Sequence, residues 1–193
     1  MPRHPPIRLG PAEISRTTGA PLPGDPNTPP AGAAPAAAPP ALLPQPSRVS
    51  ALVLVSPGLT GYSWPEDPGP HAEFVSLAAA GDIDGVAAFI GRMWAAAGPG
   101  DGAAAQLRSA AKAWLANGDF EQEDPPAVGR LGDIAVPAIL LIGDKDYPPL
   151  IQCDELIVAG IPGCRKIDVP GGDHLLPLRV PGLVADTIIE LAG

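Results

Sequence analysis

Two continuous apolar segments, each about as long as a β-strand, stand out along the chain. Residues 48–58, RVSALVLVSPG, are β-branched and aliphatic until the run stops at Pro-Gly. Residues 136–146, VPAILLIGDKD, repeat the pattern, with a proline near the start and Gly143 just after the apolar run. Such runs predict strands buried on both faces, as in a parallel sheet. A third, weaker strand is predicted within residues 164–172, CRKIDVPGG.

Apolar residues at helical spacing fill the stretches after these strands. Residues 149–163 show this spacing, and the predicted helix stops at Gly160. Residues 180–193 close the chain in the same way, from Leu183 to Leu191. The order strand, helix, strand, helix predicts an α/β domain with a parallel sheet and flanking helices.

Residues 62–130 differ from the rest, because they contain Ala-rich helical stretches and no clear strand. So long a helical segment between two strands of one sheet predicts an insertion rather than a simple crossover. The large side chains of this segment could pack the insertion's own core and its contact with the sheet. Alternatively, they could form the inner face of a lid over an apolar substrate. These side chains are Trp64, Phe89, Met93, Trp94 and Trp114.

The first quarter of the chain has a composition unlike that of a folded domain. Half of the 28 prolines fall within residues 1–46, and few aromatic or β-branched residues accompany them. Pro/Ala-rich sequence buries too little apolar surface to offset the entropy lost on folding. We therefore expect a disordered lead over residues 1–47 and a folded domain over residues 48–193. Abundant Gly, Pro and Ala are also typical of a GC-rich bacterial genome.

Charge and cysteine content exclude several classes of function. The net charge is −9, and all but two of the 21 acidic residues follow residue 48. An acidic domain disfavours nucleic acid and anionic membrane surfaces as partners. Cys153 and Cys164 are too few for a zinc site or a disulfide framework, so free thiols and no metal or cofactor are expected. Without an apolar targeting segment, a cytoplasmic location is expected.

Asp146 and His174 are the residues best placed for chemistry. Each follows the end of a predicted strand, and parallel strands bring their carboxyl ends to one rim of the sheet. An aspartate that accepts a hydrogen bond from one imidazole nitrogen fixes the tautomer and leaves the other nitrogen free to take a proton. The spacing therefore predicts an acid–histidine pair.

Simpler explanations compete with this pair. A single loop histidine is more often a surface residue, and an aspartate after a strand is often a turn former. Asp144 and Asp173 are alternative acids, although Asp173 directly precedes His174, where adjacent side chains diverge. Asp146 lies farther onto its loop. The remaining histidines, His4 and His71, are expected to be exposed to solvent.

Three separated motifs now carry a family resemblance. RVSALVLVSPGLTGY, VPAILLIGDKD and VPGGDHLLPLRVPGLV, in this order and spacing, resemble the C-terminal half of α/β-hydrolase fold proteins, such as bacterial esterases, enol-lactonases and C–C hydrolases. The resemblance implies that residues 48–56 form the sixth strand of the family's sheet and residues 137–142 the seventh. It also implies that 62–130 is a cap, that Asp146 is the acid and that His174 is the catalytic histidine.

The nucleophile of that family is absent from the sequence. It normally sits on a G-x-S-x-G elbow that precedes the acid and the histidine, and no serine of this chain has glycines at those positions. Ser56, at the end of the first strand, is a conceivable substitute, but it lacks an elbow and an oxyanion hole. A nucleophile lost or supplied by another polypeptide is the other explanation.

Two hypotheses on function follow. The first is a hydrolase of a small, apolar ester, lactone or similar carbonyl substrate, with a Ser-His-Asp mechanism. The second is an inactive, truncated remnant that at most binds a partner or a small ligand. The lead could then be a wrong-frame or wrong-start translation of a former nucleophile half. An unpaired first strand would leave an apolar sheet edge, through which we expect self-association.

Overall fold

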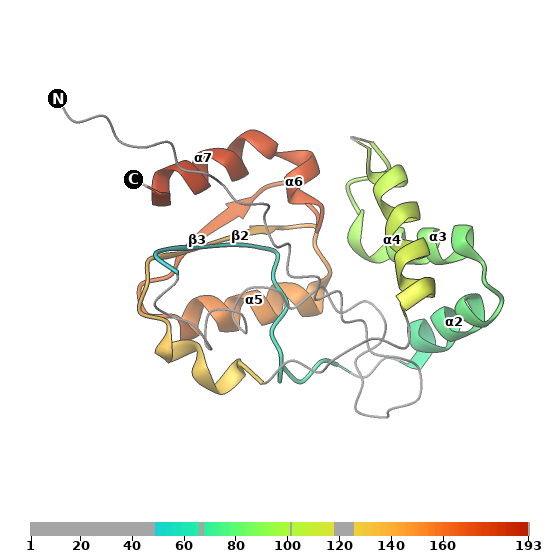
Figure 1. Ribbon diagram of the computed structural model, residues 1–193, viewed down its shortest axis with the longest axis horizontal. Coiled ribbons are helices and arrows are strands. Elements are labelled where there is room, and N and C mark those ends of the chain that lie inside the picture. The colour runs from blue at the N-terminus through green and yellow to red at the C-terminus, as the bar shows by residue number, and fades with distance from the viewer. Residues whose placement is uncertain (1–48, 66–67, 101, 118–125, 193) are drawn as a thin grey trace.

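The computed structural model describes residues 49–65, 68–100, 102–117 and 126–192 (Figure 1). The lead expected over residues 1–47 lies outside the described residues. A three-stranded parallel sheet forms the centre of the described chain, in the order β1-β2-β3. Its strands are β1 (Leu52–Val55), β2 (Ala138–Gly143) and β3 (Arg165–Val169). The predicted α/β class, with parallel strands and flanking helices, is confirmed.

Burial explains why two strands were clear in the sequence and one was weak. Every residue of β2 is buried, so its sequence is an unbroken apolar run. Strand β3 has one fully buried residue, Val169, and its other side chains reach solvent to some degree. Strand β1 is shorter than the predicted run, because the backbone leaves the extended region at Ser56, where φ is +45°.

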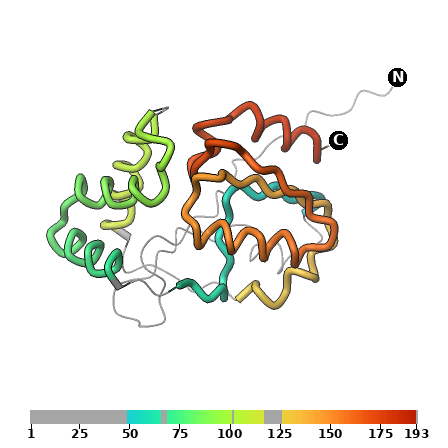
Figure 2. Tube along the Cα trace, turned by 180° about the vertical axis from the view of Figure 1, so that it is seen from behind, coloured from blue at the N-terminus to red at the C-terminus, as the bar shows by residue number. Residues whose placement is uncertain are grey.

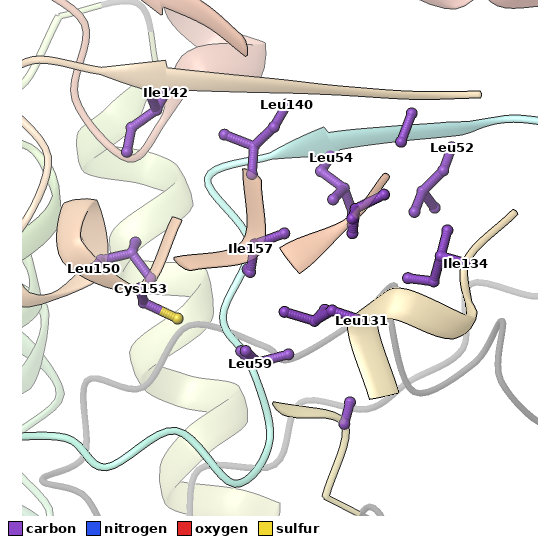
Figure 3. Packing of buried hydrophobic residues seen from close by; sticks show 13 residues of the cluster. Leu52, Leu54, Leu59, Leu131, Ile134, Leu140, Ile142, Leu150, Cys153 and Ile157 are labelled. Atoms are coloured by element: carbon purple, nitrogen blue, oxygen red, sulfur yellow. The ribbon is translucent and has the colours of Figure 1, made fainter. Parts of the chain in front are cut away.

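Helices cover both faces of the sheet. One face packs against α5 (Pro148–Gly160) and the 3₁₀ helix η2 (Val128–Asp133), and the other packs against α6 (Leu176–Arg179) and α7 (Pro181–Ala192). Figure 1 shows α5 and α7 on opposite sides of the strands. Figure 3 shows the larger of the two cores, in which Leu54 and Leu140 of the sheet lie near Ile157 and Leu131. Burial on both faces is what the continuous apolar strands require.

Three helices between β1 and β2 form a separate layer with its own core. They are α2 (Pro68–Ala79), α3 (Ile83–Trp94) and α4 (Ala103–Asn117). Figures 1 and 2 show them together beside the end of the sheet at which α6 begins. Their core contains Phe74, Val86, Phe89, Ile90, Leu107 and Ala111. Most large side chains of this segment therefore pack within it, whereas Trp64 packs against the sheet's core.

Strand β1 lies at the edge of the sheet. It pairs with β2, and among the described residues no strand pairs with its other side. In the described part of the chain, no helix is long and apolar enough to cross a membrane.

Candidate active site

Two loops meet tightly at the carboxyl end of β2 and β3. Gly143 ends β2, and a Cβ there would lie 2.2 Å from the carbonyl oxygen of Gly172, so only glycine fits without a shift of the backbone. The Lys145 amide donates to the same oxygen at 2.9 Å. The Asp146 amide donates back to Gly143 at 3.2 Å and closes a turn. This contact of backbone with backbone brings the loop of Asp146 beside the loop of His174.

The two predicted site residues lie within hydrogen-bonding distance at this rim. His174 Nδ1 lies 3.3 Å from Asp146 Oδ2, and the Asp146 side chain is fully buried. The other carboxylate oxygen, Oδ1, accepts the backbone N–H of Tyr147 at 2.7 Å. A proton on His174 Nδ1 can therefore be donated to Asp146. That tautomer leaves Nε2 as a proton acceptor.

An aromatic ring from the helical layer lies against the imidazole. The centroids of the Trp94 and His174 rings are 4.8 Å apart, with 37° between their planes. Trp94 is the last residue of α3, so the helical layer contributes directly to the surroundings of the histidine. From the sequence, Trp94 was a cap-core residue or part of a lid face. The structure places it in contact with the imidazole, while the His174 side chain retains 11% of its exposed area.

The two alternative acids have other partners. Asp144 Oδ1 accepts the Gly171 amide at 2.7 Å, which again joins the two loops. Asp173 is buried and ion-paired with Arg179. Burial alone would raise the pKa of Asp173, but hydrogen bonds from Arg179, Ala97 and Leu175 outweigh it and hold that pKa below its usual value. Asp146 is thus the acid whose carboxylate meets His174.

Solved bacterial structures share this arrangement of elements. A hydrolase from Oleispira antarctica matches with a TM-score of 0.59 and 17% identity, over 78% of this chain and 58% of its own. A hydrolase from Pseudomonas aeruginosa gives a TM-score of 0.58 and 24% identity, over 80% and 60% of the two chains. The esterase RhEst1 from Rhodococcus gives 0.60 and 14%, over 79% and 59%. No family model and no curated protein matches the sequence significantly.

The described chain is part of an α/β-hydrolase fold. It spans about three fifths of the length of these solved α/β-hydrolase structures.

No serine of the sequence lies in a G-x-S-x-G elbow, and Ser56 directly follows β1. It has the one positive φ of a non-glycine residue in the described chain, and its Oγ is buried without a hydrogen-bond partner among the described residues. Its amide donates to Leu141 at 2.9 Å. A left-handed serine after a strand is strained. Within the described residues, however, no hydrogen bond joins Ser56 to His174 or Asp146.

A buried carboxyl that the sequence interpretation missed lies near the acid. Asp154, on α5, is fully buried, and neither carboxylate oxygen has a hydrogen-bond partner among the described residues. Burial, and next the charge of Asp146, raise its pKa to about 9, so this carboxyl is neutral at pH 7. Its position could have revealed it: Asp154 stands between Leu150 and Ile157 at the spacing of the buried face of α5.

An open apolar depression of about 360 Å³ lies between α3 and α4, and Gly91, Ala95 and Leu107 help to line it. Neither His174 nor Asp146 belongs to its lining. Across the described ranges, no group of three or more His, Cys, Asp and Glu residues is close enough to hold a metal ion. The candidate active site therefore centres on Asp146 and His174.

Proposed function

We propose that the protein hydrolyses a small ester, lactone or related carbonyl compound with His174 as general base and acid and Asp146 as the group that orients it. The observation that supports this most is the 3.3 Å contact between His174 Nδ1 and a fully buried Asp146 carboxylate at the strand ends. Such a contact is needed for an imidazole that must accept and return a proton.

The proton transfers follow from the tautomer. With Nδ1–H directed at Asp146, Nε2 takes the proton of the attacking hydroxyl as oxygen bonds to the substrate carbonyl carbon. The imidazolium that forms is stabilised by the Asp146 charge. It then returns the proton to the leaving alcohol or the opened lactone oxygen. Asp146 stays ionised throughout.

The nucleophile is the part that this chain does not supply in a recognisable form. No G-x-S-x-G sequence is present, and the chain spans about three fifths of the solved structures it matches. We propose that a further strand bearing the nucleophile pairs with the free edge of β1, from a longer form of the chain or from another polypeptide. Where no such strand is present, the same edge would mediate self-association.

The substrate class and location rest on the fold and on the surroundings of the histidine. The matched structures include a carboxylesterase and an enzyme described as degrading N-acyl homoserine lactones. Trp94 beside His174 favours an apolar carbonyl substrate rather than a charged one. We also propose that the protein acts in the cytoplasm, without nucleic acid or membrane as partner, in keeping with its net charge of −9.

A second candidate function, an inactive remnant that binds a ligand or partner, is favoured by the missing elbow. Hydrolysis of p-nitrophenyl acetate by the purified chain, alone and mixed with candidate completing polypeptides, separates the two. If the proposal holds, His174→Ala and Asp146→Ala each reduce turnover by about 10²-fold or more. The matched control, His71→Ala on α2, leaves turnover unchanged. Turnover that survives both site substitutions would overturn the assignment.

Serine-directed fluorophosphonate labelling locates the nucleophile in the same samples. A reactive serine displaces fluoride and gains the phosphonyl group, which mass spectrometry assigns to one residue. Labelling at Ser56 of the chain alone, lost in Ser56→Ala, would make Ser56 the nucleophile. Labelling confined to an added polypeptide would support completion at β1. Absence of both labelling and turnover in every mixture would leave the non-enzymatic function.

A further inference from the structure

We infer that Asp173 and Arg179 are positioning residues: they fix the end of the cap on the histidine loop, so that Trp94 keeps the imidazole of His174 turned toward Asp146. This inference rests on the proposed role of His174. It concerns how a cap that packs its own core is coupled to the catalytic rim.

Both oxygens of the Asp173 carboxylate accept hydrogen bonds that connect the cap to the histidine loop. We call this set of contacts, together with those of Arg179, the joint. Oδ1 accepts the Leu175 amide at 3.0 Å and Arg179 Nε at 3.2 Å. Oδ2 accepts Arg179 Nη2 at 2.8 Å and the Ala97 amide at 3.0 Å. Ala97 belongs to the segment that follows α3, 76 residues earlier in the chain. One buried carboxylate therefore ties the cap, the histidine loop and α6 together.

Arg179 binds the same cap segment a second time. Its Nη1 donates to the Gly100 carbonyl at 3.0 Å, and its Nη2 donates to the Gly98 carbonyl. The Arg179 side chain is only 9% exposed and that of Asp173 is fully buried. Arg179 makes four hydrogen bonds to the carboxylate and the two carbonyls, whereas a lysine ammonium has only three N–H donors. Segment 97–100 is thus held through its backbone, whatever its side chains are.

The joint lies directly beside the histidine. His174 stands between Asp173, which binds the cap segment, and Leu175, which packs against the cap core. Trp94 precedes Ala97 by three residues, and its ring contacts the imidazole at 4.8 Å. A cap that moves away must break these hydrogen bonds and withdraw the indole from His174. The contact between the cap and the histidine loop is therefore coupled to the orientation of the imidazole.

The burial of this ion pair argues against a purely stabilising role. Desolvation of two charges consumes most of what their attraction returns, so a buried pair is weak evidence for a stabilising role. Defined geometry is the role that we infer for this pair. The ion pair Arg165–Glu190, at 2.7 Å, is by contrast about half exposed on both sides and does not join the cap to the sheet. The lowered pKa of Asp173 keeps the pair charged across the pH range in which imidazoles titrate.

Tryptophan fluorescence tests the coupling in the chain as it exists. An imidazolium quenches a touching indole more strongly than a neutral imidazole does, so emission should fall as His174 is protonated. The quantity measured is the change in fluorescence emission with pH in the parent protein, minus the same change in Trp94→Phe. This subtraction removes the contribution of Trp64 and Trp114. His174→Gln should abolish the remaining change, which we call the fluorescence step. We expect Asp173→Asn and Arg179→Met to reduce this step at least threefold, Arg179→Lys to reduce it less, and the control Arg165→Met to leave it unchanged.

Amide hydrogen exchange separates a broken joint from an unfolded cap. In Arg179→Met we expect the Ala97 amide to lose protection at least tenfold, while Val86 to Ile90 inside α3 keep theirs. If Asp173→Asn and Arg179→Met both leave the fluorescence step and the exchange protection of the Ala97 amide unchanged, the inference is overturned. This holds even if His174→Ala abolishes turnover. Conversely, turnover that survives His174→Ala would defeat the proposed function and leave the joint between cap and loop standing.

Discussion

The two ends of the rim at the carboxyl ends of the strands differ in how completely their polar groups are hydrogen-bonded. At the end of β2 and β3, Asp146, Asp173 and Arg179 are buried or nearly so, and each has defined hydrogen-bond partners. At the end of β1, Ser56 is buried with an unpartnered hydroxyl, and the edge of the strand is unpaired among the described residues. Buried polar groups are normally satisfied. Among the described residues, the rim therefore has a completed side at Asp146 and His174 and an incomplete side at Ser56 and the edge of β1.

The largest effect is expected where the two loops of the completed side touch. Gly143→Ala places a Cβ 2.2 Å from the Gly172 carbonyl oxygen, so the two loops must separate. We expect a loss of about 3 kcal/mol or more in the free energy of unfolding, measured by urea denaturation. Gly132→Ala in η2, where a Cβ meets nothing within 4 Å, is the control. Equal midpoints for the two variants would mean that the loops are not in contact.

Asp154 should make the protein less stable as pH rises. Its pKa is about 9 when folded and near 3.8 when unfolded, so between these values the folded state binds more protons. The contribution of Asp154 to the free energy of unfolding is then fully present below the unfolded pKa. It is lost as pH rises toward 9, by up to about 1.4 kcal/mol per pH unit. Asp154→Asn should flatten this slope between pH 5 and 9, in urea denaturation at several pH values. The control Asp186→Asn, at an exposed position on α7, should leave the slope unchanged. Identical slopes in the parent, Asp154→Asn and Asp186→Asn would contradict the burial of Asp154.

The smallest effect concerns the incomplete side. The amides of Leu52 and Ser56 donate toward β2, so by alternation the amide of Val53 faces the free edge. Val53→Pro removes this outward donor and spares the ladder to β2. We expect the dissociation constant for self-association to rise at least tenfold, about 1.4 kcal/mol, by sedimentation velocity. Val53→Thr is the control, and equal association of Val53→Pro and the parent would exclude the β1 edge as the interface.

The strands, their order in the chain and the acid–histidine pair could be predicted from sequence because each follows from a local pattern. Continuous apolar runs marked β1 and β2, and Asp146 and His174 followed two strand ends that a parallel sheet must bring together. The joint between Asp173, Arg179 and segment 97–100 could not be predicted, because its partners lie 76 to 81 residues apart in sequence.

Three further features were not predicted, for other physical reasons. The end of β1 at Val55 depends on a left-handed serine, which no apolar pattern predicts. Asp154 was overlooked because a polar residue at a buried helical position is the exception to the pattern that locates the helix. The contact of Trp94 with His174 depends on how α3 meets the rim, and helical spacing alone gave it two possible roles.

The imidazole N–H signals of ¹⁵N-histidine-labelled protein test most directly whether Asp146 orients His174. We expect a downfield Nδ1–H resonance that disappears in His174→Gln, is lost or strongly shifted upfield in Asp146→Ala, and persists in His71→Gln and in Asp144→Asn. A His174 resonance that is the same in the parent and in Asp146→Ala would contradict the acid–histidine pair on which the proposed function depends.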